Sequence, residues 1–202
     1  MILHALRALA LLLALAATVG EAAADEPGSG TIRGIVDHRL AKSRPAAVYV
    51  ERIEGKTFPP PAEPAVLDQI DQEFVPDLLV VLAGTEIRFT NSDSVEHNVR
   101  TADDSLNLDL TFKEAKTVRV EKPGVLLLGC RIHSAMRGYI VVVETPYFAA
   151  TERGRFEIAG VPAGAYRLTF WHPALLPSTL DVVVESGGVA EVAFRELSRR
   201  EE

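Results

Sequence analysis

The stretch Cys130-Arg131-Ile132-His133-Ser134-Ala135-Met136 holds a thiol, an imidazole and a thioether on one short loop. In a blue-copper site, two His and one Cys form a trigonal plane and a weakly bound Met lies on the axis. The second imidazole must then come from a distant strand. His97 lies 33 residues before Cys130, a separation that two strands and their connections would fill. The stretch therefore predicts a β-sheet protein in which a metal joins two strand ends.

Cys130 is the only cysteine of the chain. Outside the cytoplasm, a lone accessible thiol tends to be oxidised or to pair between chains. A buried core thiol is the ordinary explanation for such a residue. The His at +3 and the Met at +6 favour a metal ligand instead.

Residues 1–24 have the features of a signal peptide. Arg7 precedes an apolar run, residues 8–19, and small residues lead to a cleavage site near Ala24. The run is about twelve residues long, and no later segment approaches the roughly 20 apolar residues of a transmembrane helix. We therefore expect an exported protein, periplasmic or otherwise extracytoplasmic, without a transmembrane segment.

Short strand-like runs separated by turn residues fill the chain from residue 65 to residue 146, and they predict an all-β sandwich or barrel. These runs are residues 65–69, 78–82, 86–90, 117–120, 125–129 and 139–144. Residues 103–113 are polar and are expected to form a loop or a short helix. The proline-rich residues 56–64 are expected to be an extended linker.

The strand pattern restarts after Pro146 with four runs, residues 154–158, 166–170, 179–184 and 190–194. Four strands are too few for a comfortable independent sandwich. Two earlier runs, residues 32–36 and 46–51, would complete it. We therefore expect a discontinuous second domain, residues 31–58 and 147–197, with the domain of residues 65–146 inserted into it and a polar tail at 198–202.

Residues 65–146 resemble the cupredoxins, the small blue-copper proteins of the plastocyanin and amicyanin type. The matching motifs are Glu73-Phe74-Val75-Pro76, Gly84-Thr85, Ile87 to Asp93, His97-Asn98 and the Cys130 to Met136 loop. The resemblance implies a Greek-key β-sandwich with one mononuclear type 1 copper. It implies equatorial ligation by His97, Cys130 and His133, with Met136 axial and His133 as the electron port. It also implies that Asn98 forms hydrogen bonds around the thiolate.

The flanking segments resemble a carboxypeptidase regulatory-like domain, a small transthyretin-type β-sandwich. The matching motifs are Gly34 to Asp37, Ala46 to Val50, Gly154 to Ile158 and Val161 to Leu168. This resemblance implies packing or recognition rather than catalysis.

We expect a type 1 copper protein that shuttles single electrons between periplasmic redox partners through transient contacts. No enzyme is expected, because four histidines follow residue 24 and the two left after the first site cannot build a multi-histidine copper cluster. The same ligands allow a copper carrier, storage or sensing module. A third interpretation is a structural interaction protein whose copper site is vestigial, and the complete set of ligands argues against it.

Residues beside the ligands are candidates for partner docking. Arg100, Arg131 and Arg137 are either solvated side chains or a positive rim that steers an acidic partner, while Ile132 and Ala135 could add an apolar patch. His38 and His172 are either structural or ligands of a second metal or a partner. The net charge of −7 argues against nucleic acid as a partner. The oligomeric state is left open.

Overall fold

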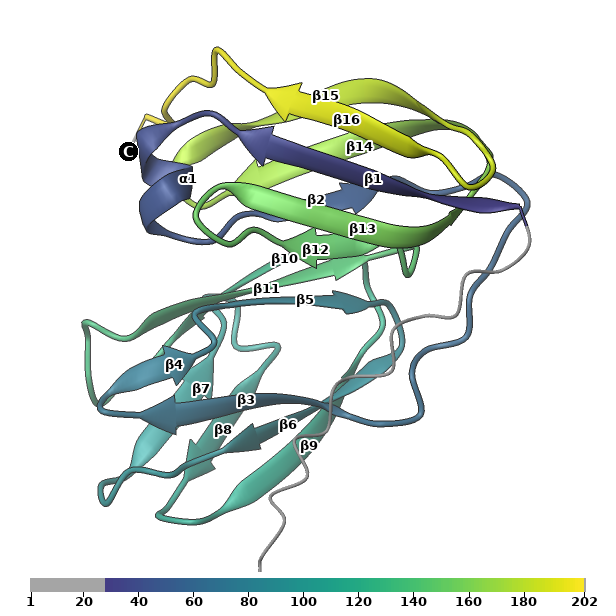
Figure 1. The fold of residues 1–202 in the computed structure, drawn as a ribbon. Helices are drawn as coiled ribbons and strands as arrows, with labels where there is room; N and C mark the ends of the chain where they lie inside the picture. Colours follow the sequence, from purple (N-terminus) through teal and green to yellow (C-terminus); the bar gives the residue numbers. More distant parts are fainter. Residues whose placement is uncertain (1–27, 202) are drawn as a thin grey trace, which may run out of the picture.

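Four β-sheets stacked as layers form the fold of residues 28–201, the part of the chain that this computed structural model describes (Figure 1). The expected signal peptide, residues 1–24, lies outside these residues. The layers contain sixteen strands and one short helix, so the all-β prediction is confirmed. Among the described residues, no helix is long and apolar enough to cross a membrane.

Two of the sheets combine strands from both ends of the described chain, and we call this pair the flanking sandwich. Its outer sheet has the order β13 (Arg155–Pro162), β1 (Ser29–Val36), β16 (Val189–Phe194). Its inner sheet has the order β12 (Phe148–Ala150), β2 (Ala47–Val50), β14 (Gly164–His172), β15 (Leu175–Val184). The helix α1 (Arg39–Ser43) connects β1 to β2.

The other two sheets come from the continuous segment 65–143, which we call the inserted sandwich. Its inner sheet has the order β5 (Leu78–Leu82), β11 (Arg137–Val143), β10 (Gly124–Gly129), β7 (His97–Arg100), β8 (Asn107–Leu110). Its outer sheet has the order β4 (Glu73–Val75), β3 (Ala65–Ile70), β6 (Thr85–Thr90), β9 (Ala115–Val120). The linker expected at residues 56–64 contains no strand or helix.

Three apolar clusters separate the four layers, and the alternation of side chains along the inner strands produces them. On β14, Leu168 and Phe170 point into the core of the flanking sandwich, whereas Trp171 points to the other face. On β11, Ile140 belongs to the core of the inserted sandwich and Val141 to the cluster between the sandwiches. Both inner sheets are thus covered on two faces, which explains why their strands are apolar at consecutive positions.

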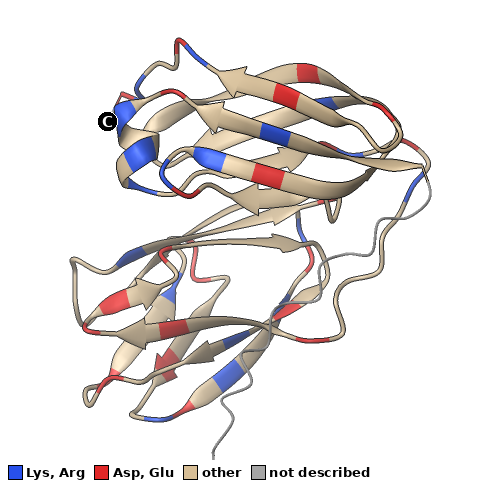
Figure 2. Ribbon diagram, viewed as in Figure 1, with Lys and Arg blue, Asp and Glu red and all other residues tan. Residues whose placement is uncertain are grey.

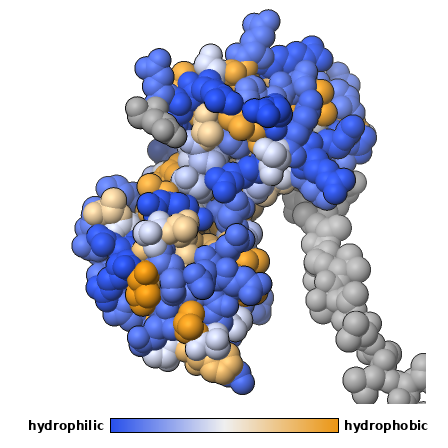
Figure 3. Space-filling model, turned by 90° about the vertical axis from the view of Figure 1, so that its left-hand side faces the viewer, coloured by the Kyte–Doolittle hydropathy of each residue, from blue (hydrophilic) through white to orange (hydrophobic). Residues whose placement is uncertain are grey.

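One apolar cluster lies between the inner sheets of the two sandwiches, and we call it the waist cluster. It consists of Ala47, Leu78, Val80, Val141, Val143 and Trp171, with Tyr49, Tyr139 and Phe148 packed against it. An ion pair between Arg44 and Asp77, 3.3 Å apart, lies beside it. Outside the waist cluster, charges of both signs are spread over both sandwiches (Figure 2). The face seen in Figure 3 is mostly hydrophilic, with its apolar residues in separate patches.

Five elements differ from the sequence-based expectation, because the strand-like runs named from the sequence include none of the strands β4, β7, β8 and β12, and no helix was expected at α1. Residues 103–113, expected as a loop or short helix, contain β8, whose four residues pair with β7 at the sheet edge. Its polarity misled the prediction because an edge strand needs only one buried face, and in β8 only Leu110 is fully buried. The segment between the expected runs 32–36 and 46–51, for which no element was expected, contains α1, whose first turn is capped by the His38 side chain.

The two histidines outside the copper motif both accept a hydrogen bond from the backbone. His38 Nδ1 accepts from the Leu40 N–H at 3.2 Å, and His172 Nδ1 accepts from the Ala174 N–H at 3.1 Å. His172 is 1% exposed and its ring stacks with Phe170. Within the described residues, neither histidine belongs to a group of possible metal ligands. Their observed roles are structural.

His172 makes the stability of the flanking sandwich depend on pH. Burial, followed by the nearby positive charge of Arg44, lowers the pKa of His172 to about 4. The imidazole is neutral in the folded protein but protonates near pH 6.5 in the unfolded chain. The free energy of unfolding should therefore fall as the pH drops from about 6.5 to about 4, by roughly 3 kcal/mol from this residue.

The His172→Gln variant should lack this part of the pH dependence, because glutamine does not titrate. Urea unfolding of both proteins at several pH values between about 7 and about 4 would measure the difference. Parallel curves for the two proteins over that range would contradict the prediction.

Candidate metal centre

Three donor side chains from separate parts of the chain meet at one end of the inserted sandwich. The ligand atoms of His97, Cys130 and His133 all lie within 4.8 Å of one another. His97 begins β7, Cys130 directly follows β10, and His133 lies in the loop that leads to β11. Gly129 in β10 pairs antiparallel with Arg100 in β7, so the start of β7, which holds His97, lies beside the loop that follows β10. The structure thus gathers the two imidazoles and the thiol singled out from the sequence.

The two imidazoles face each other through the same ring nitrogen. His97 Nδ1 and His133 Nδ1 are 3.0 Å apart, and the ring centroids are 4.8 Å apart. His97 is fully buried and His133 is half-buried. Two imidazole nitrogens that face each other beside a thiol sulfur are donors of the kind that a transition metal would bind.

The sulfur of Cys130 accepts two backbone hydrogen bonds. The N–H groups of Asn98 and His133 each lie 3.4 Å from Cys130 Sγ. The side chain is buried, with 6% exposure. N–H donors directed at a sulfur favour the thiolate, the form of cysteine that binds metals.

Met136 ends the ligand loop and is buried with 2% exposure. Its N–H donates to the His133 carbonyl at 3.1 Å, so the loop closes in a tight turn before β11 begins. Its neighbour Ala135 is exposed, and Ile132 is 49% exposed. The loop therefore directs its thioether inward and leaves two apolar side chains on the surface.

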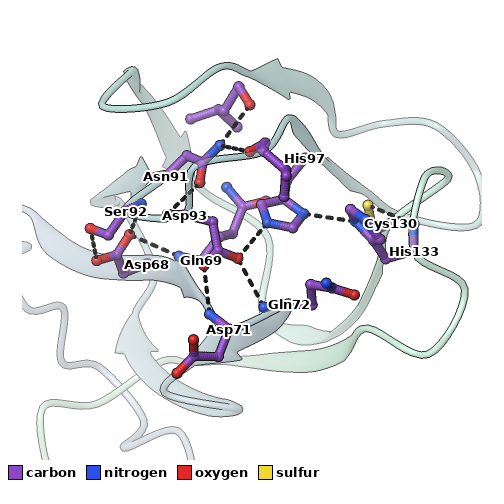
Figure 4. A network of polar contacts seen from close by, with 12 residues as sticks. Asp68, Gln69, Asp71, Gln72, Asn91, Ser92, Asp93, His97, Cys130 and His133 are labelled. Atoms are coloured by element: carbon purple, nitrogen blue, oxygen red, sulfur yellow. Dashed lines mark hydrogen bonds and ion pairs between the residues drawn. The ribbon is translucent and has the colours of Figure 1, made fainter.

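Asp93 fixes the orientation of His97, as Figure 4 shows. Asp93 Oδ2 lies 2.6 Å from His97 Nε2. A carboxylate can only accept here, so the Nε2 atom carries the proton and Nδ1 keeps its lone pair for a metal. Asp93 also accepts from the N–H groups of Asp71 at 2.7 Å and Gln72 at 2.9 Å.

The hydrogen bonds to Asp93 also set its charge. Burial alone would raise the pKa of Asp93, but donation from the Gln72 amide, from His97 and from the Asp71 amide outweighs it and holds the pKa below its ordinary value. Asp93 is therefore ionised at neutral pH. Asp71 and Gln72 form the turn between β3 and β4 with φ of 53° and 61°, a left-handed conformation that non-glycine residues adopt at a cost. The two turn amides and His97 are thus held by one carboxylate.

Asn91 shapes the loop that carries Asp93. Its Nδ2 donates to the carbonyls of Val95 at 2.8 Å and Leu110 at 3.0 Å, and its Oδ1 accepts from the Asp93 N–H at 2.9 Å. The residue is 1% exposed. A buried amide with its hydrogen bonds made is a rigid support.

A second carboxylate ties Asn98 to the ligand loop. Asp109 Oδ1 accepts from Asn98 Nδ2 at 2.9 Å, and both Asp109 oxygens lie 2.6 Å from Arg131 Nη2. The hydrogen bond from Asn98, followed by that from Arg131, lowers the pKa of Asp109. The backbone N–H of Asn98 therefore contacts the Cys130 sulfur, and its side chain is linked through Asp109 to Arg131 in the ligand loop.

Two supporting residues, Asp93 and Asp109, were missed in the sequence. The only local signal for Asp93 is an acid four residues before a candidate histidine ligand. No signal marks Asp109, because its contact with Arg131 depends on β8, which the sequence did not predict.

The donor set fits a transition metal that accepts thiolate and imidazole. Carboxylates, which Ca²⁺ and Mg²⁺ prefer, are not among the clustered ligand atoms. Asp93, the nearest acid in the network, is occupied by His97 and two amides. Cysteine and histidine suit zinc or copper.

Replacing Asp93 with asparagine should weaken metal binding by about 10-fold to 100-fold, the usual effect of losing such a support. Both carboxylate oxygens of Asp93 accept hydrogen bonds from N–H groups. In asparagine an NH₂ group replaces one of these oxygens, and it would face an N–H donor without being able to accept from it. Competition with a chromophoric chelator would measure the affinity. The matched control is Asp103→Asn, since Asp103 also holds a turn, through Thr101 and Ser105, but touches none of the clustered donors. Equal affinities in the two variants would contradict the prediction.

The arginines expected near the site converge on one cavity of about 250 Å³. Arg100, Arg131 and Arg137 line it together with Cys130. Ala135 and Met136 line a different cavity, beside Phe74 and Arg44. Arg137 lines both cavities, so the two groups of candidate docking residues adjoin each other at this side chain.

Solved structures similar to this chain include a purple cupredoxin from Nitrosopumilus maritimus. The matched region is 24% identical in sequence and spans 39% of this chain and 98% of the cupredoxin chain, with a TM-score of 0.37. A reduced Cu(I) form of an amicyanin variant is 22% identical over 41% of this chain and 84% of its own, with a TM-score of 0.38. An oxidized amicyanin variant is 21% identical over 39% of this chain and 81% of the amicyanin chain, with a TM-score of 0.37. No protein-family model and no curated protein matches the chain.

Proposed function

We propose that this protein binds one copper ion through His97, Cys130, His133 and Met136 and carries single electrons between redox proteins outside the cytoplasm. The observation that supports this most is the convergence of two Nδ1 atoms and a thiol sulfur within 4.8 Å. When bound, copper supplies the one-electron chemistry by alternating between Cu(I) and Cu(II). The site would be mononuclear and of type 1.

The residues of the site favour small rearrangement between two oxidation states. His97 is held by Asp93, and Cys130 by two backbone amides. Asp93 precedes β7, Asn98 lies in β7 and His133 follows β10, and these two strands pair in one sheet. A site held by several strands changes shape little, and that suits fast electron exchange.

His133 is the natural place for electrons to enter and leave. It is half-buried, whereas His97 has no exposed surface and Cys130 is 6% exposed. The exposed Ile132 and Ala135 lie on either side of it in the loop. A small apolar contact of this kind suits a transient redox complex. No reaction is proposed beyond electron transfer.

A Cu(II) titration of residues 25–202, followed by visible absorption, tests the proposal. An intense thiolate-to-copper band that saturates at one equivalent is expected, and Met136→Leu should shift the band without removing it. A weak spectrum typical of nitrogen and oxygen ligands, or no binding, would overturn the proposal.

A copper carrier is the alternative, and the half-buried His133 would give an acceptor access to the metal. Loading with Cu(I) and adding a chelator separates the two functions. Slow loss of copper together with fast electron self-exchange supports the shuttle. Rapid transfer with slow self-exchange supports the carrier.

A further inference from the structure

The cavity beside Cys130 is built by three strands in register. Gly129 of β10 lies directly opposite Arg100 of β7 on one side and Arg137 of β11 on the other. Directly opposed residues in antiparallel strands project their side chains to the same face. Two arginines therefore flank a position with no side chain, and this leaves a hollow between them.

The arginine side chains stay close to this hollow. Arg137 Nη1 lies 3.5 Å from the point where a Cβ atom on Gly129 would be. Arg131, one residue beyond Cys130, also lines the cavity. The cavity, which we call the arginine pocket, thus has three arginines around a glycine.

The charge of the arginine pocket is not balanced from within. Its lining contains no Asp or Glu. Arg100 Nη2 pairs with Asp104 at 3.1 Å, and Arg131 pairs with Asp109. Among residues 28–201, Arg137 forms no ion pair, and its guanidinium donates to the Met136 carbonyl at 3.1 Å. Each guanidinium has five N–H donors, so most donors in the pocket remain available to an acceptor.

We propose that the arginine pocket binds a glutamate or aspartate side chain presented by a protein partner. Carboxylates match the planar fork of arginine and can accept two hydrogen bonds from it. Asp104 and Asp109 offset the charges of Arg100 and Arg131, so Arg137 supplies the uncompensated positive charge that would attract an acidic partner. Since Cys130 lines the same pocket, the bound carboxylate would place its protein beside the metal centre.

The surroundings of the pocket favour a protein over a free anion. Val125 and Leu127 share the outward face of β10 with Gly129 and are 42% and 45% exposed. The same face of this sheet is covered by the flanking sandwich at β5 and β11, through the waist cluster. An uncovered apolar row next to a cationic hollow fits an acidic segment that also carries apolar side chains.

The use of this pocket in electron transfer rests on the proposed function, but the binding of a carboxylate does not require the metal. The binding test should therefore be done with metal-free and with Cu(I)-loaded full-length mature protein, and equal affinities are expected. If the protein bound the peptide but not copper, only the proposed function would be contradicted. If it bound copper but not the peptide, only the proposal for the arginine pocket would be contradicted.

The test is an NMR titration with a short peptide in which glutamate alternates with leucine. Shifts of the amides of Arg100, Gly129 and Arg137 should saturate with a Kd of about 1 mM or lower at low salt, and the affinity should fall as salt rises. Arg137→Gln and Arg100→Gln should each weaken binding about 10-fold. The matched control is Arg33→Gln, an exposed arginine of the flanking sandwich.

Four results would overturn the proposal. The glutamine analogue of the peptide could bind equally well, or the affinity could be unchanged in both pocket variants. Arg33→Gln could weaken binding as much as they do. Acetate could reproduce the shifts with the same affinity, which would assign the pocket to a small anion. The amide spectrum of each variant shows whether it is folded, and either pocket variant alone suffices for the test.

Discussion

The Cys130→Ser variant should bind copper without the thiolate absorption band and at least about 100-fold more weakly, a loss of about 2.7 kcal/mol. Cys130 is the only thiol of the chain, so no other residue can supply a soft anionic donor. A serine hydroxyl stays protonated at neutral pH and is a poor ligand for Cu(I). Absorption spectra and chelator competition would measure the two effects.

Two comparisons separate loss of a ligand from loss of the fold. The metal-free Cys130→Ser protein should unfold at nearly the same denaturant concentration as the wild type, because the hydroxyl can still accept from the Asn98 and His133 amides. Met136→Leu conserves the side-chain volume and should keep an intense band. A thiolate-like band that persists in Cys130→Ser would show that the wild-type band does not come from this thiol.

The clustered donors could be found from the sequence because the loop is short. Cys130 and His133 are three residues apart, so any tight turn keeps their donors together. His97 could be found because it lies in a polar turn 33 residues before Cys130, a separation that two strands and their connections would fill. The carboxylate that orients it could not be found. Asp93 meets His97 and the β3–β4 turn at once, and that meeting depends on how two strands pair rather than on a local pattern.

The strand content was predictable, whereas the stacking of the two sandwiches was not. Period-two patterns and turn residues identified most strands. Three runs, residues 46–50, 78–82 and 139–143, are apolar at consecutive positions, which is typical of strands covered on both faces. That signal shows that a second face is buried but not what covers it. The structure supplies the answer, since all three runs contribute to the waist cluster.

Replacing Trp171 with alanine should lower the free energy of unfolding by about 3–5 kcal/mol. The side chain is 8% exposed and its ring lies 5.3 Å from that of Tyr139, in the inserted sandwich. Its removal leaves a cavity in the waist cluster, where neither rigid sheet can collapse to fill it. The loss is a large fraction of the stability of an ordinary domain. Urea unfolding followed by far-ultraviolet circular dichroism would measure it.

The same variant should separate the unfolding of the two sandwiches. A bound metal stabilises the folded state by mass action. In the wild type the waist cluster couples the unfolding of the two sandwiches, so the stabilisation by the metal extends to both. Calorimetry should therefore show one transition, whose midpoint temperature rises with Cu(I). In Trp171→Ala, the flanking sandwich should unfold in a transition that Cu(I) does not move. Trp171→Phe keeps an aromatic ring against Tyr139 and should retain the single transition. A single metal-dependent transition in Trp171→Ala would mean that other contacts, such as the 2.7 Å hydrogen bond from Thr145 Oγ1 to the Val50 carbonyl, couple the sandwiches without the tryptophan.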